Sequence, residues 1–195
     1  MKARLPILPT LVVAAAVLVM IGLGIWQLQR AKEKEALLAR YEAARGLPPI
    51  AFPKFAGEEL PLFRRASGHC LRVASVRSTA GQNREGETGF VHIADCATGA
   101  EGPGMAVEMG WSKDPNAGRT WTGGAVSGVI APDRNKRIRL VSATGLGGLE
   151  ASAPPSPASI PNNHRFYAVQ WFLFAAIAAI IYWLALRRRQ AKGEA

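Results

Sequence analysis

The stretch from Asn162 to Arg189 reads NNHRFYAVQWFLFAAIAAIIYWLALRRR, and it decides the expected fold. Between Arg165 and Arg187 it holds 21 residues without a charge, enough for an α-helix to cross a hydrocarbon layer of about 30 Å. The two asparagines before His164 are of the residue type that caps a helix N-terminus. We therefore predict a transmembrane helix that begins at His164.

A second uncharged run, from Leu5 to Gln29, lies near the start of the chain. A cleaved signal peptide is the alternative, because Lys2 and Arg4 resemble its basic first segment. Its apolar part, however, is normally about 7–15 residues long and is followed by a small-residue cleavage site. The run here is longer and passes through Trp26 into a charged helical sequence without such a site. We expect a retained anchor.

The net charge of +10 is concentrated outside the middle of the chain. Residues 31–163 carry 16 Lys/Arg and 13 Asp/Glu, a balance of only +3. Lys and Arg close to a span mark its cytoplasmic side. The basic residues before the first run and the three arginines after the second therefore predict cytoplasmic termini and an outer middle. The positive charge thus mainly sets the orientation of the spans in the membrane. Membrane lipid is therefore expected as a partner, and nucleic acid is not.

The middle of the chain has a different character. Apolar residues recur at near-helical spacing until Gly46 and two prolines supply a stop signal. Short alternating runs separated by turn residues follow and predict a small β sheet, barrel or sandwich. The expected strands are Leu71–Val76, Gly89–Ile93, Met105–Trp111, Ala125–Ile130 and Arg137–Val141. Beyond Thr144 the chain is rich in Gly, Ala, Ser and Pro and reads as a linker.

The predicted fold class is thus membrane α+β, a hairpin of two transmembrane helices that encloses a small extracytoplasmic β-rich domain. The expected parts are a cytoplasmic N-terminus (1–7), transmembrane helix 1 (8–29), a helix extension (30–46), the β-rich domain (47–143), a Gly/Pro/Ser linker (144–163), transmembrane helix 2 (164–186) and a basic cytoplasmic tail (187–195).

The two cysteines, Cys70 and Cys96, are not in a CxxC or CxxCH arrangement, which excludes covalent c-type haem attachment. In an oxidising compartment they could pair, and two buried free thiols are the alternative. His69 beside Cys70 is not expected to bind a metal with it, because neighbouring residues in a strand point to opposite faces. We find no phosphate loop, zinc-protease motif, nucleophile elbow or carboxylate dyad, so we do not expect an enzyme.

His164 is the residue with the most suggestive surroundings. Tyr167 and Trp171 follow it at i+3 and i+7 and so share its helix face. Trp26, Gln27 and Arg30 lie near the same outer boundary if the two spans pair antiparallel. Aromatic residues also populate membrane interfaces in general, which is the structural alternative. An imidazole beside apolar walls and a guanidinium nevertheless suits a haem with its propionates.

Small residues are placed so that the spans could approach closely. Gly22 and Gly24 on the first run would face Ala175 or Ala179 on the second. We expect the notch for a ligand to form at the outer end of this contact.

The segments PNNHRFYAVQWFLFA…IYWLALRRR and GLGIWQLQRAKEKEALL resemble the Surfeit locus 1 family of cytochrome c oxidase assembly factors. Phe63-Arg64-Arg65 with Gly68, Gly89-Phe90 and Gly110-Trp111 are similar to stretches of that family. The family's usual NRGW is replaced here by Glu108-Met109-Gly110-Trp111, a departure that bears on partner contacts and not on the membrane site.

The resemblance implies a membrane protein that transiently binds haem a and assists its insertion into the catalytic subunit of cytochrome c oxidase. We expect a bacterial inner membrane, because no Arg/Ser-rich transit sequence stands before the first span. Haem a synthase is a second implied partner. By resemblance His164 is the axial ligand of the iron. Trp26 and Trp171 are the expected walls of the haem site, Arg30 is the expected partner of a propionate, and the Tyr167 hydroxyl is placed by geometry near a polar haem substituent. Gln170 could meet a polar haem substituent. A scaffold that holds an oxidase assembly intermediate without binding haem is the alternative.

Overall fold

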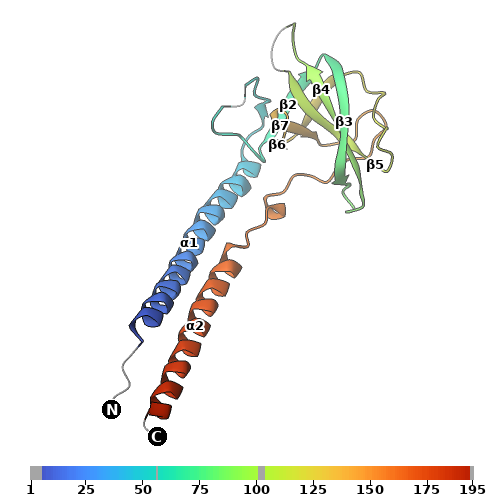
Figure 1. Ribbon diagram of the computed structural model, residues 1–195. Helices are drawn as coiled ribbons and strands as arrows, with labels where there is room; N and C mark the ends of the chain where they lie inside the picture. Colours follow the sequence, from blue (N-terminus) through green and yellow to red (C-terminus); the bar gives the residue numbers. More distant parts are fainter. Residues whose placement is uncertain (1–5, 56, 101–103, 194–195) are drawn as a thin grey trace. The chain divides into compact units, whose positions relative to one another are not determined.

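The computed structural model describes residues 6–55, 57–100 and 104–193. Residues 1–5 of the predicted cytoplasmic N-terminus and residues 194–195 of the predicted basic tail therefore lie outside the described residues. Helix α1 spans Ile7–Gly46 and helix α2 spans His164–Gly193 (Figure 1). The predicted first span and its charged extension form one continuous helix in α1. The start of α2 at His164 is the predicted one, and between the two helices the chain forms a β domain.

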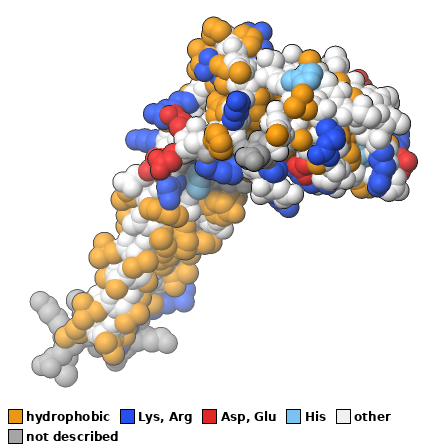
Figure 2. All heavy atoms as spheres, turned by 90° about the horizontal axis from the view of Figure 1, so that it is seen from above, with side chains coloured by type: hydrophobic (Ala, Val, Ile, Leu, Met, Phe, Trp, Pro, Cys, Tyr) orange, Lys and Arg blue, Asp and Glu red, His pale blue; other side chains and the backbone are white. Residues whose placement is uncertain are grey.

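In the uncharged part of α1, up to Gln29, and in α2 from Phe166 to Leu186, apolar side chains lie around most of the helix circumference. Leu18 on α1 and Ile181 on α2 are 68% and 62% exposed. Figure 2 shows hydrophobic side chains over the visible surface of the helical part. By length and composition each helix could cross a membrane. A helix that is apolar on nearly all sides and yet exposed suits hydrocarbon as its solvent.

The two helices run antiparallel and contact each other along a narrow seam. On α1 the less exposed positions recur at alternating spacings of three and four residues, which is typical of helices packed at a shallow angle. On α2 Ala168 and Ala175 are buried. A hydrogen bond of 2.5 Å joins the hydroxyls of Thr10 and Tyr182. The positions on α1 are Thr10, Val13, Val17, Met20, Gly24, Gln27 and Ala31.

Gly24 leaves room for the ring of Phe172 in the contact between the helices. A Cβ atom at this position would lie 2.6 Å from Cε1 of Phe172, so no larger residue fits without movement. As predicted, Gly24 and Ala175 lie in the helix contact. Gly22 has open space around it and Ala179 is exposed, so these two predicted contact residues lie outside the seam.

Replacing Gly24 with leucine is expected to weaken helix pairing by about 1–3 kcal/mol, because the side chain would overlap the ring of Phe172. Spin labels on exposed Leu18 and Leu173 would report this as a longer and broader distance distribution by pulsed electron paramagnetic resonance. The matched control is Gly22→Leu, which has room for the side chain and should leave the distribution unchanged. Equal distributions for both variants would contradict the packing.

The β domain is one mixed sheet in the order β1-β2-β6-β7-β5-β4-β3. β1 pairs parallel with β2 and β5 parallel with β7, and the remaining pairs are antiparallel. All five predicted strands form, most of them longer than expected, and β1 and β2 are additional. The strands are β1 Ile50–Ala51, β2 Arg65–Cys70, β3 Arg72–Gln82, β4 Thr88–Ala97, β5 Met105–Ser112, β6 Gly124–Asp133 and β7 Arg137–Ser142.

The sheet curls so that strands far apart in its order meet. Only Leu71 separates β2 from β3, although the two strands lie near opposite ends of the sheet. A disulfide of 2.07 Å joins Cys70 of β2 to Cys96 of β4. The disulfide alternative for the two cysteines is therefore the observed one. Both cysteines belong to the buried apolar core, together with residues such as Val107 and Leu140.

Residues 144–153, expected as part of a linker, are hydrogen-bonded to the sheet. The backbones of Trp111 and Glu150 exchange two hydrogen bonds of 2.7 and 3.1 Å, and Ala153 N donates to Gln82 O at 2.8 Å. Leu149 packs against the core. This segment is aperiodic, as its composition predicts, but it is a fixed part of the β domain.

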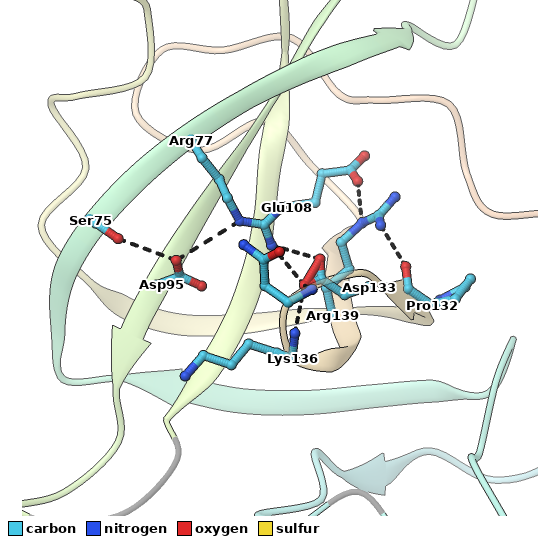
Figure 3. Close-up of polar contacts among 9 residues, drawn as sticks. Ser75, Arg77, Asp95, Glu108, Pro132, Asp133, Lys136 and Arg139 are labelled. Atoms are coloured by element: carbon cyan, nitrogen blue, oxygen red, sulfur yellow. Dashed lines mark hydrogen bonds and ion pairs between the residues drawn. The ribbon is translucent and has the colours of Figure 1, made fainter.

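A network of hydrogen bonds and ion pairs joins charged side chains of the sheet (Figure 3). Glu108 stands between two core residues of β5, and Arg139 between two core residues of β7, so both point to the other face. Arg139 Nε donates to Glu108 Oε2 at 2.7 Å. Arg77 of β3 donates to both carboxylate oxygens of Asp133 at the end of β6, at 2.8 and 2.6 Å. The network thus ties edge strand β3 to the end of β6.

Candidate functional site

The candidate site is His164, the first residue of α2. The carbonyl of Asn163 accepts the first helical hydrogen bond, from Tyr167 N at 3.1 Å, so His164 lies in the first turn. Its ring is half-buried, and Nδ1 lies 2.8 Å from Oε1 of Gln27 on α1. Because an amide oxygen only accepts, Nδ1 carries the proton and donates. In the neutral ring Nε2 then carries the lone pair, and among the described residues we find no hydrogen-bond partner for it.

Tyr167 and Trp171 share the helix face of His164, as the spacing predicts. Tyr167 is 48% exposed and meets Phe166 edge-on, with ring centroids 6.1 Å apart. Trp171 is half-buried and meets Phe174 edge-on at 6.2 Å. Side chains of this kind give His164 an aromatic and largely apolar flank on α2.

Trp26 and Arg30 are not brought to His164. Trp26 precedes Gln27 by one residue, a rotation of about 100° around the helix axis. Since Gln27 faces α2, Trp26 lies on another side of α1, where it is 48% exposed. Arg30 lies over the Trp26 ring at 5.9 Å and pairs with Glu33 at 2.8 Å. These two predicted site residues therefore form a separate cluster along α1.

The rim of the site contains an ion pair that the sequence analysis did not predict. Arg165 meets Glu35 of α1 through two contacts of 2.8 and 3.0 Å. Both side chains are substantially exposed, so this pair contributes at most about 1 kcal/mol. Three residues before Arg165 in the sequence, Oδ1 of Asn162 is buried without a hydrogen-bond partner among the described residues.

Gln27 is the functional candidate that sequence reasoning assigned no role. It is a polar residue inside an uncharged span, and it lies in the seam three residues after Gly24 and four before Ala31. That spacing is the signal that could have identified it, because it places an amide where only apolar or small side chains are otherwise found.

The β domain offers no comparable site. Within the described residues no group of three or more His, Cys, Asp or Glu could hold a metal ion. His69 is exposed, and Cys70 beside it is in the disulfide. His92 is fully buried, with its ring nitrogens 2.9 and 2.8 Å from the hydroxyls of Ser78 and Ser112. Burial lowers the pKa of His92, and the charge of Asp114 opposes this.

Residues of all three family-like stretches have a structural explanation. Gly110 has a φ of 153°, and a Cβ there would lie 2.3 Å from Glu150 O. The close approach of the segment 144–153 therefore requires glycine at this position. Trp111 packs over Gly89, where a Cβ would lie 2.6 Å from the indole. Phe63 is buried and meets Tyr41 with ring centroids 5.0 Å apart. These residues stabilise the β domain.

The sequence matches the SURF1 family over residues 14–176. This range contains most of α1, all strands of the β domain and the first turns of α2 with His164. A comparison with curated proteins gives no match.

Proposed function

The chain belongs to the SURF1 family, which is associated with cytochrome oxidase assembly, and from this premise we propose that it binds haem a and assists its insertion into the catalytic subunit of a cytochrome c oxidase. SURF1 assembly factors are generally not enzymes. The observation that carries the proposal is the His164 ring, which is fixed through Nδ1 and has its Nε2 lone pair free.

The residues around His164 fit a haem. A histidine that ligates a metal usually donates its other ring N–H to a protein acceptor, as Nδ1 does here to Gln27. Tyr167 and Trp171 add apolar surface on the same face. The helix seam itself is filled, since Phe172 packs onto Gly24. This packing favours binding on the outer side of α2 over binding between the helices.

If bound, haem a would supply an iron, and Nε2 of His164 is the nitrogen that would hold it. The chain contributes a neutral ring nitrogen held in one orientation and an apolar flank. No bond-making chemistry by the protein is required, since its task is to hold the cofactor and release it. Haem a synthase as donor and the oxidase catalytic subunit as acceptor are the proposed partners.

With two candidate spans the chain is a membrane protein. We place both termini in the cytoplasm and the β domain on the outer side of a bacterial inner membrane. The arginines at 187–189 directly after the apolar part of α2 support this orientation. A disulfide in the β domain is also expected of an oxidising compartment.

The test is the visible spectrum of the protein, purified in detergent from cells that make haem a. The wild type is expected to show a reduced haem a band, and His164→Ala is expected to lose about tenfold or more of the bound haem. His69→Ala, which removes an exposed histidine of the β domain, is the matched control and should keep the band. No band in any of the proteins would overturn haem binding and leave a scaffold that stabilises an oxidase assembly intermediate.

A further inference from the structure

We propose that Gln27 is the positioning residue of this site, which fixes the tautomer of His164 and turns its Nε2 away from α1. The expected effect of Gln27 on haem binding rests on the proposed function. The tautomer itself can be tested without haem.

The position of Gln27 makes its hydrogen bond with His164 strong. It lies in the seam between the buried positions Gly24 and Ala31, with its side chain half-buried. A polar amide in such surroundings is costly unless it finds a partner. The ring of His164, 2.8 Å away, is the partner that the structure provides for the amide oxygen. At low local dielectric this contact is stronger than in water.

The direction of the contact determines which nitrogen is available. The amide oxygen has no proton to give, so the proton of the neutral imidazole lies on Nδ1. The two ring nitrogens point in widely different directions. With Nδ1 directed at α1, Nε2 is directed away from it. Trp26, on another side of α1, is therefore not expected to affect a ligand of Nε2.

A matched control for Gln27 lies two residues further along the same helix. Gln29 is the same residue type within the same uncharged run, but it is exposed and has no hydrogen-bond partner among the described residues. Gln27→Leu removes the acceptor and suits an apolar seam. Gln29→Leu makes the same chemical change outside the seam. Any difference between the two variants reports the contact with His164.

The first experiment is nitrogen NMR of the haem-free protein with ¹⁵N-labelled histidine, at a pH about two units above the ordinary histidine pKa of about 6.5. The chain has three histidines, and His164→Ala identifies the signals of His164. We expect the Nδ1–H tautomer in the wild type and in Gln29→Leu, and a shift toward the Nε2–H tautomer in Gln27→Leu. An Nε2–H tautomer in the wild type would mean that the amide group donates, and would overturn the inference.

The second experiment measures haem a affinity and reduction potential. Gln27→Leu is expected to weaken haem binding about 10–100-fold, the usual effect of losing the group that orients a metal-bound histidine. Gln27→Glu restores an acceptor, so it should keep binding and lower the reduction potential through a more basic imidazole. Gln29→Leu should behave as the wild type does.

The outcomes separate the two proposals. Haem binding that depends on His164 but is the same in Gln27→Leu and Gln29→Leu would overturn the role of Gln27 and leave the proposed function standing. A wild-type protein that binds no haem would overturn the proposed function, while the NMR result would still decide whether Gln27 sets the tautomer. Loss of binding in Gln27→Leu with rescue in Gln27→Glu supports both.

Discussion

Replacing Asp133 with alanine is expected to lower the free energy of unfolding of the β domain by about 3–5 kcal/mol, the usual cost of removing one partner from a buried ion pair. The side chain of Asp133 is 1% exposed and accepts both hydrogen bonds from Arg77 Nη2. It also accepts the backbone N–H groups of Asn135 and Lys136 at 3.2 and 3.1 Å. The variant leaves Arg77 with Asp95 as its remaining carboxylate, 3.9 Å away.

The measurement is denaturant unfolding of the purified protein, followed by the fluorescence of Trp111 and Trp121 in the β domain. Glu85→Ala, which removes an exposed carboxylate from the turn between β3 and β4, is the control and should change stability by no more than about 0.5 kcal/mol. If Asp133→Ala unfolds at the same denaturant concentration as Glu85→Ala, the network does not stabilise the domain.

The pH dependence of stability gives the same prediction a second readout. Burial alone would raise the pKa of Asp133, but the hydrogen bonds from Arg77 and from the backbone of Lys136 and Asn135, with the charge of Arg77, lower it overall. A carboxylate with a lowered folded-state pKa stabilises the fold above its unfolded pKa of 3.8. This contribution is lost as the pH falls below that value and through the lower folded pKa. Asp133→Ala should therefore show a flatter acid limb than the wild type.

The sequence predicted the elements with a clear hydropathy pattern, which is alternation between apolar and polar residues in a strand and a long apolar run in a membrane helix. Both helices and five strands fall in this class. Strand β2 was not predicted because RASGHC lacks an apolar alternation, and its buried positions are the small residues Ala66 and Cys70. The network of Arg77 and Asp133 was not predictable either. It depends on the curling of the sheet, which brings β3 to the end of β6 and which no local pattern encodes.

The part of the candidate site that lies on α2 alone was predictable from the sequence. Spacing along α2 is enough to put His164, Tyr167 and Trp171 on one face. The rotation of α1 about its own axis depends on packing against α2, and Trp26 was assigned to the site without that information. The seam positions Gly24 and Gln27 fix this rotation. A reading of small and polar residues at spacings of three and four on α1 would have selected Gln27 in place of Trp26.

Removing the disulfide with Cys70→Ala and Cys96→Ala together is expected to destabilise the β domain by about 3 kcal/mol, because the cross-link closes a loop with a sequence separation of 26. The bond also joins β2 to β4, which are separated by three other strands in the sheet, so it holds the curled sheet closed. Unfolding of the double variant, measured with and without a reducing agent, checks this.

The reducing agent separates the cross-link from the packing of the two side chains. The wild type under reducing conditions should lose most of the stability that the double variant loses, whereas the double variant should not respond to the agent. Since the bond requires an oxidising compartment, a β domain on the outer side of the membrane should also be found oxidised when free thiols are labelled in intact cells. A wild type that is equally stable in both conditions would contradict stabilisation by the cross-link. Cysteines that are labelled in intact cells without prior reduction would contradict the proposed outer location of the domain.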